Sequence, residues 1–180
     1  MSNTLKLAPD LYTNPGKTSI PGMRWDYRQI TLATTDLITT QLVAINVLPA
    51  GHRLMHAVLE SASLDSHVTT TITITVGVLN SYLGQMPAGG ASTGLPVATY
   101  NSGGQTDLTS TEPALVSGQN IITASTICRA GGRVDTFALA FSTGIGIDTT
   151  KDRIIAFYFP ALPATAAGGI LRLGICIDQP

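Results

Sequence analysis

The residues that decide the fold read TTTITITVGVLN at positions 69–80. Threonine and aliphatic side chains alternate through this stretch almost without interruption. Because successive side chains of a β-strand point to opposite faces, a period of two predicts a strand with one polar and one apolar face. The apolar face consists of Ile72, Ile74, Val76 and Val78, and the polar face of Thr69, Thr71, Thr73 and Thr75. The stretch therefore predicts a half-buried strand.

The residues before this strand predict a partner for it. Leu48-Pro49-Ala50-Gly51 has the composition of a turn, and residues 52–59 predict a second strand. Leu64-Asp65-Ser66 is rich in turn formers, so it predicts a polar corner between the two strands.

Further short apolar segments predict more strands at residues 30–34, 38–47, 135–141, 153–159 and 170–177, with one more near Val97. Residues 153–159 are apolar on both sides, which predicts a strand covered on both faces. Residues 120–128 predict a short helix or a short strand, and the helix is favoured. About eight strands without a βαβ rhythm predict an all-β fold, an antiparallel β-sandwich of the jelly-roll type.

The domain organisation follows from the changes in composition. Residues 1–28 carry several prolines and glycines and predict an extended N-terminal arm, which either folds back on its own domain or docks on a neighbouring subunit. Residues 29–180 predict a single β-sandwich domain. Within it, residues 81–118 are rich in Gly, Ser, Thr and Pro and predict a long loop excursion.

Bulk composition excludes several classes of partner. Only 12% of the 180 residues are charged and the formal net charge is −1, so the sequence predicts no nucleic-acid binding. Its apolar runs fall short of the ~20 residues that span a bilayer, which predicts no membrane insertion. The N-terminus lacks the pattern of a signal peptide. Cys128 and Cys176 have no metal-ligand spacing and are expected to be reduced and buried.

None of the possible catalytic or metal-binding motifs in the sequence meets the requirements of its chemistry. Residues 90–94 match G-x-S-x-G, but a nucleophile elbow needs a strand before the serine and a helix after it, and neither is predicted here. His52, His56 and His67 lack the spacing of a metal site, and Leu54 is expected to share a face with His52 and His56. The aspartates at 135, 148 and 152 do not form a calcium loop. The sequence therefore predicts no catalytic residue, no metal and no cofactor.

Several segments together resemble a known family. They are residues 48–54, 58–61, 64–66 and 73–80, followed by 124–126, 130–132 and 152–155, and then the Ala/Thr-containing loop and strand at 161–173. In this pattern of strands and corners the chain resembles the head decoration, or capsid cement, proteins of tailed bacteriophages. It departs from them in its long N-terminal segment and in Pro160.

The resemblance implies a structural virion protein rather than an enzyme. Such a protein is made in the host cytoplasm, binds the outer surface of the capsid and stabilises contacts between subunits of the major capsid protein. It is expected to associate with itself, as a trimer or else as a dimer, and to need no cofactor. Aromatic and apolar residues are the expected contacts with the capsid or a neighbouring subunit: Leu11, Tyr12, Trp25, Tyr27, Tyr82 and Tyr100.

One alternative stays open from the residues themselves. A receptor- or glycan-binding jelly-roll module of a phage tail or fibre would have a similar strand pattern. The low aromatic content of 6% and the lack of a visible aromatic cluster count against it, whereas Tyr82 and Tyr100 in the predicted excursion leave it open.

Overall fold

The computed structural model describes residues 4–7, 23–82, 114–136 and 152–178. These residues form a short 3-10 helix, η1 (Thr34–Asp36), and nine strands. The strands are β1 (Thr4–Leu7), β2 (Arg24–Leu32), β3 (Gln41–Leu48), β4 (Arg53–Ser61), β5 (Thr73–Tyr82), β6 (Leu115–Ser125), β7 (Gly132–Asp135), β8 (Arg153–Ala161) and β9 (Gly169–Asp178). Among the described residues, no helix has the length and apolar character needed to cross a membrane.

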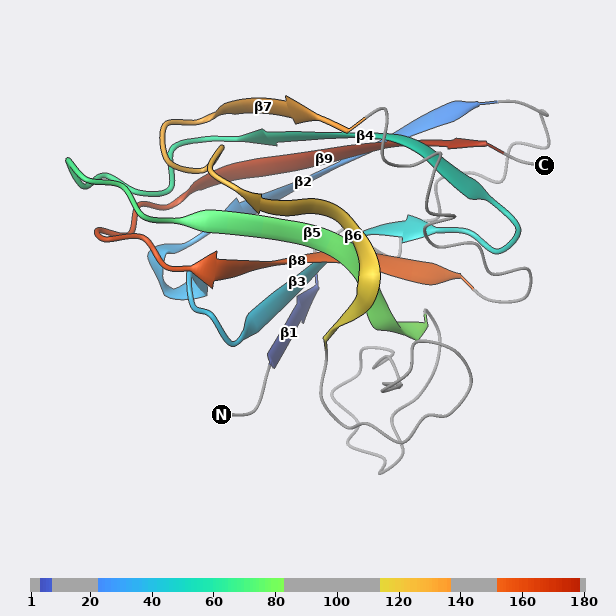
Figure 1. Cartoon of the computed structure of the whole chain (residues 1–180), viewed down its shortest axis with the longest axis horizontal. Coiled ribbons are helices and arrows are strands. Elements are labelled where there is room, and N and C mark those ends of the chain that lie inside the picture. The colour runs from blue at the N-terminus through green and yellow to red at the C-terminus, as the bar shows by residue number, and fades with distance from the viewer. Residues whose placement is uncertain (1–3, 8–22, 83–113, 137–151, 179–180) are drawn as a thin grey trace.

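The strands form two stacked sheets, as Figure 1 shows. One sheet has the order β1-β3-β8-β5-β6 and the other the order β2-β9-β4-β7. Strands β2 to β9 form four antiparallel pairs that are nested in the sequence: β2 with β9, β3 with β8, β4 with β7 and β5 with β6. Strand β9 also pairs with β4, and β8 also pairs with β5, so that the four pairs are joined into two sheets. This is the topology of a jelly roll, and it confirms the predicted antiparallel sandwich. Strand β1 adds to it in parallel with β3.

The strand that the sequence predicted best is β5. Its apolar residues from Ile72 to Val78 are completely buried, as the alternation requires. The strand itself begins at Thr73 and not at Thr69, because the backbone N–H of Thr71 donates to the carboxylate of Asp65 in the preceding corner. Residues 69–71 therefore belong to the corner.

The core lies between the two sheets, and β8 and β9, which are inner strands of their sheets, contribute many of its buried residues. On β9, Leu171, Leu173, Ile175 and Ile177 are at most 1% exposed, in agreement with the predicted inner face. On β8, residues 154–157 are all completely buried, which confirms a strand covered on both faces. The rings of Phe157 and Phe159 meet edge to face with centroids 5.7 Å apart.

The helix favoured for residues 120–128 is wrong, because residues 115–125 form strand β6. The pairing of β6 with β5 shifts register three times, so that β6 carries extra residues opposite β5. One result is that the consecutive residues Ile121 and Ile122 are both buried. Bulges of this kind erase the period of two that identifies a strand.

The predicted end of the N-terminal arm at residue 28 is also wrong. Strand β2 begins at Arg24 and pairs with β9 without a break, so residues 24–28 belong to the sandwich. The inward side chains here are charged and hid the alternation. Arg28 and Asp26 form an ion pair of 3.1 Å at side-chain exposures of 8% and 10%. Asn46 on β3 donates to Asp26 at 3.4 Å. The ion pair of Arg28 and Asp26 and the amide donor of Asn46 satisfy one another, which stabilises polar groups at this depth.

The predicted excursion at residues 81–118 overlaps two strands, since β5 runs to Tyr82 and β6 starts at Leu115. Its remainder, including the strand predicted near Val97, lies outside the described residues. The strand predicted at 135–141 overlaps β7 only at Asp135, where β7 ends, and residues 137–141 lie outside the described residues.

Asp65 links two connections between the sheets. Its carboxylate accepts backbone N–H bonds from Thr71 at 2.8 Å and His67 at 3.2 Å in the corner before β5. It also accepts from Ala164 at 3.0 Å and Thr165 at 3.1 Å in the connection between β8 and β9. The residue is 2% exposed. Asp65 is thus much more than a turn former, because its buried carboxylate accepts hydrogen bonds from the backbone of both segments.

Both cysteines are buried and unbridged, as predicted. Burial raises the pKa of the Cys128 thiol to about 11, and a hydrogen bond from the Ser61 hydroxyl opposes this only in part. Burial also raises the pKa of Cys176, with a smaller contribution from the charge of Asp178. Thiols with raised pKa values form little reactive thiolate at neutral pH.

Candidate functional site

The face of the sheet β2-β9-β4-β7 that points away from the core carries two exposed aromatic rings; we call it the outer face. Trp25 and Tyr27 alternate with inward residues of β2 and are 43% and 59% exposed. Their rings stack with centroids 5.5 Å apart and an interplanar angle of 17°.

A glycine makes room for this arrangement. Gly174 on β9 pairs directly with Tyr27, and a methyl group at Gly174 would collide with the tyrosine ring. The ring of Tyr27 therefore lies directly against the backbone of β9. Only glycine permits so close an approach at this position.

A bulge in β4 brings His56 to the same face. Leu54 pairs with the inward residue Ile177, whereas His56 pairs with Cys176, so the register shifts between them. The prediction that Leu54 and His56 share a face is therefore wrong. The His56 ring meets Trp25 edge-on at 5.0 Å, and its Nε2 lies 3.1 Å from a carboxylate oxygen of Asp135 on β7.

The rest of the outer face, on β9, β4 and β7, carries charged side chains. Arg133 donates to Asp135 from Nε at 3.0 Å and lies 3.9 Å from Glu60. Arg172 lies 3.9 Å from Glu60 on its other side, and it also donates to Gln29 at 2.8 Å. The hydrogen bond from Arg133 lowers the pKa of Asp135 and outweighs the opposing effect of burial. The carboxylate of Asp135 is therefore ionised at neutral pH.

A shallow hollow of about 240 Å³ lies next to the pair Glu60–Arg172. It is lined by Glu60, Ser61, Ala62, Ile170 and Arg172. Ile170 is 40% exposed. The outer face thus combines an aromatic pair, a set of paired charges and a hollow with one apolar wall.

This arrangement suits recognition of a ligand. Arg133, Asp135, Glu60 and Arg172 each have an oppositely charged partner within 3.9 Å. Their hydrogen-bonding groups are consequently held in place before any ligand arrives, which lowers the entropic cost of binding. Within the described ranges, no group of three or more His, Cys, Asp or Glu residues could hold a metal ion.

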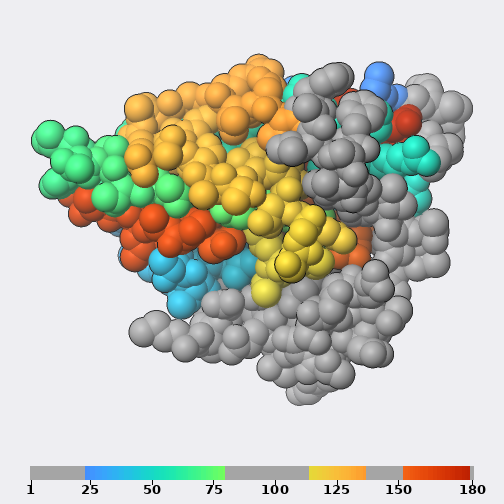
Figure 2. Space-filling view, viewed as in Figure 1, coloured from blue at the N-terminus to red at the C-terminus, as the bar shows by residue number. Residues whose placement is uncertain are grey.

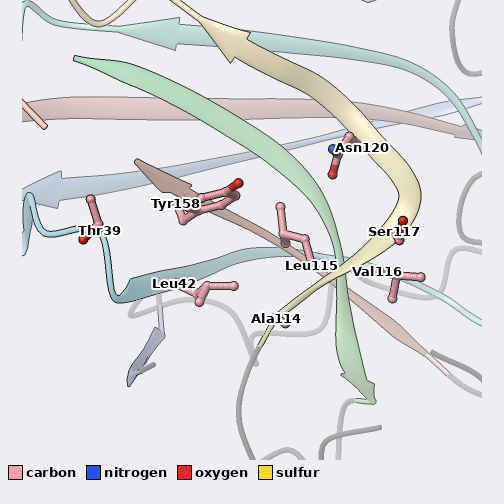
Figure 3. Close-up of a pocket in the computed structure, with 8 residues that line it drawn as sticks. All are labelled: Thr39, Leu42, Ala114, Leu115, Val116, Ser117, Asn120 and Tyr158. Atoms are coloured by element: carbon pink, nitrogen blue, oxygen red, sulfur yellow. The ribbon is translucent and has the colours of Figure 1, made fainter. Parts of the chain in front are cut away.

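A second hollow, of about 320 Å³, lies on the other sheet. Figure 3 shows its lining: Thr39, Leu42, Ala114, Leu115, Val116, Ser117, Asn120 and Tyr158. Strand β6, yellow in Figure 2, provides half of these residues. None of these lining side chains is charged, so the hollow has fewer means of selecting a ligand than the outer face.

The structure places two of the six predicted contact residues together. Trp25 and Tyr27 are neighbours on the outer face, in a folded strand and not on an arm. The backbone of Tyr82 ends β5 opposite Arg153, and nothing is described of its side chain. Leu11, Tyr12 and Tyr100 lie outside the described residues.

Among the other outer-face residues, the sequence drew attention to His56 and Asp135 only as possible metal ligands. Five others did not stand out: Gln29, Glu60, Arg133, Arg172 and Gly174. One signal was present, because Arg172 and Gly174 alternate with the predicted inner residues of the last strand and so had to point outward. The residues of β4 and β7 that lie next to Arg172 and Gly174 depend on strand register, which the sequence alone does not give.

Comparison with known proteins identifies the fold. No protein-family model and no curated protein matches the chain. Among solved structures, a chain of the capsid of Ralstonia phage GP4 is similar with a TM-score of 0.67 and 23% identity, over 98% of this chain and 99% of that one. A chain of the cyanophage Pam1 capsid asymmetric unit is similar with a TM-score of 0.53 and 18% identity, over 89% and 88%. At these identities the likeness establishes a shared fold.

Proposed function

We propose that this chain is a structural protein of a bacteriophage virion that binds the outside of the capsid and stabilises contacts between major capsid protein subunits. The observation that carries the proposal is the match to the GP4 capsid chain over almost the full length of both chains. The Pam1 match and the family resemblance of residues 48–80 support the same conclusion.

The proposed mechanism is mechanical. Packaged DNA loads a capsid from within, and a protein that bridges neighbouring subunits adds buried contact across their joints. A standard interface buries about 800 Å² per partner. Association as a trimer or a dimer would multiply the attachment points, because a copy held at one site rebinds at the others at high effective concentration.

The number of copies per virion tests this function. Quantitative mass spectrometry of purified virions should find hundreds of copies in a simple ratio to the major capsid protein, as binding to a repeating lattice requires. A few dozen copies or fewer would support a tail or fibre module instead. Absence from the virion would overturn both assignments.

The proposal also assigns capsid contact to the N-terminal segment. Deleting residues 1–22 should lower the copy number at least tenfold, because Leu11 and Tyr12 are predicted contacts. The deletion stops before β2, so the eight-stranded jelly roll keeps every strand pair except that of β1 with β3. Occupancy is measured on virions assembled with the truncated chain.

The control for this deletion is the fold of the truncated chain. Its circular dichroism spectrum should retain the β-sheet signal, with a cooperative thermal transition. Full occupancy by a folded truncated chain would show that the N-terminal segment makes no necessary contact. Deletion to residue 28 is unsuitable, because it would remove half of β2.

A further inference from the structure

We propose that the outer face of the sheet β2-β9-β4-β7 binds a neutral oligosaccharide. The site consists of the Trp25–Tyr27 pair, the paired charges on β4, β7 and β9, and the hollow beside Ile170. It would give a jelly roll bound to a capsid a second activity, attachment to glycans.

The aromatic pair supplies the apolar part of the site. The C–H groups on one side of a sugar ring form a small apolar surface that packs on an aromatic ring. Tyr27 is 59% exposed and rests against Gly174, while Trp25 lies alongside it. Both rings therefore offer area to a ligand, and both are already held in position on a strand.

The charged residues supply hydrogen bonds to hydroxyl groups. Guanidinium groups are multiple donors in a fixed plane, and carboxylates are multiple acceptors. Arg133 and Arg172 flank Glu60, and Arg133 also holds Asp135. Two positive and two negative side chains cancel, so the face has no excess charge to attract an ion. Its ligand is therefore a neutral sugar.

The spacing of the site favours an oligosaccharide over a single sugar. Tyr27 lies over Gly174, whereas the hollow is beside Ile170 on the same strand. Four residues of strand separate these positions, or about 13 Å at 3.3 Å per residue. The pair Glu60–Arg172 lies beside the hollow, so a linear ligand crossing from the rings would reach these polar groups as well.

A protein partner fits this face less well. Cores of protein interfaces are depleted of charged residues, which gather at the rim. Here the charges are not confined to the rim, because Glu60 and Arg172 lie opposite each other on the central strands β4 and β9. A ligand covered with hydroxyl groups satisfies such groups, whereas an apolar protein surface would bury them at a cost.

The single tryptophan of the chain makes the test direct. Trp25 belongs to the site, so fluorescence excited selectively in tryptophan reports on it alone. Purified full-length protein is titrated with gluco-, manno-, galacto- and N-acetylglucosamine oligosaccharides of increasing length, and with an acidic oligogalacturonate. At least one neutral series should give a saturable change, with a Kd at least tenfold lower for the hexamer than for the monomer.

Variants assign the binding to these residues, measured by calorimetry. Tyr27→Ala and Glu60→Gln should each raise the Kd at least tenfold. Gly174→Ala should do the same, because it displaces the tyrosine ring without removing a ligand contact. Tyr27→Phe should keep most of the affinity. The matched control Val68→Ala changes a fully exposed residue in the β4–β5 connection and should leave the Kd unchanged.

Two outcomes would overturn the inference. One is the absence of any fluorescence change at about 10 mM of every neutral series, well above a Kd of about 1 mM. The other is strong protection of Trp25 from oxidation in virions compared with the free protein, read by peptide mass spectrometry, since the face would then be covered by protein. The titration uses free protein, so failure here leaves the proposed capsid function intact.

Discussion

Replacing Asp65 with asparagine is expected to lower the midpoint of thermal unfolding by roughly 5–10 °C. Its carboxylate accepts four backbone N–H bonds of 2.8–3.2 Å from two different connections. Asparagine has one acceptor oxygen and places an NH₂ group where the carboxylate has its second oxygen. Backbone N–H donors of both connections then lose an acceptor on the buried side chain. Differential scanning calorimetry at neutral pH measures the shift.

The same carboxylate predicts a dependence on pH. Burial raises the pKa of Asp65, but the backbone hydrogen bonds lower it by more, so the pKa lies well below the usual range. A depressed folded-state pKa means that stability is fully present above the ordinary aspartate value of about 3.9. Stability is lost as the pH falls below that value toward the folded-state pKa. Urea unfolding between pH 7 and pH 2 should show a smaller acid loss in Asp65→Asn.

Asp36→Asn is the matched control for Asp65→Asn. Asp36 is also a turn aspartate, and its carboxylate accepts the backbone N–H of Ala33 at 2.8 Å. Its site is exposed, so the substitution should lower the midpoint much less. Equal midpoints for the two variants would show that Asp65 does not link the two connections.

The second large effect is expected from Phe157→Ala, at about 3–5 kcal/mol of unfolding free energy. Phe157 is completely buried on β8, between neighbours β3 and β5, and its ring packs edge-on against Phe159. Truncation leaves a cavity between the two sheets, and the sheets cannot move together enough to fill it. Urea denaturation measures the loss as a change in midpoint at constant slope.

Tyr158→Ala tests whether the effect depends on facing the core. Tyr158 is the next residue of β8 and points to the other side, where it lines the hollow of the five-stranded sheet. Its side chain is only partly buried. The expected loss is less than half of that for Phe157→Ala. Similar losses for both would mean that the two faces of β8 are equally packed.

Periodicity predicted the strands whose inner face is purely apolar. Residues 72–78 and 171–177 alternate regularly, and both were located correctly. The first part of strand β2, before the strand predicted at 30–34, escaped prediction because Asp26 and Arg28 occupy inward positions, where they pair with each other. Strand β6 escaped because its extra residues break the alternation. A single-sequence pattern contains no information about such a polar pair or bulge until the neighbouring strand is known.

The candidate site depended even more on tertiary structure. Trp25 and Tyr27 stood out as aromatic residues, but their neighbours come from β4, β7 and β9, which are distant along the chain. The side chain of His56 lies next to Trp25 only because a bulge in β4 turns it from the inner to the outer face of the sheet. Gly174 has its role only because β9 pairs with β2 in one register.

The sequence by itself determined the class of fold, because alternating apolar residues must be buried and, with no long helix predicted, only a second sheet can cover them. It also determined that β8 would be covered on both sides. Tertiary structure alone decided which polar residues share the outer face and which donors meet Asp65. The physical reason is that these contacts depend on the hydrogen-bond register between strands and on the approach of two distant connections, and side-chain periodicity within one strand specifies neither.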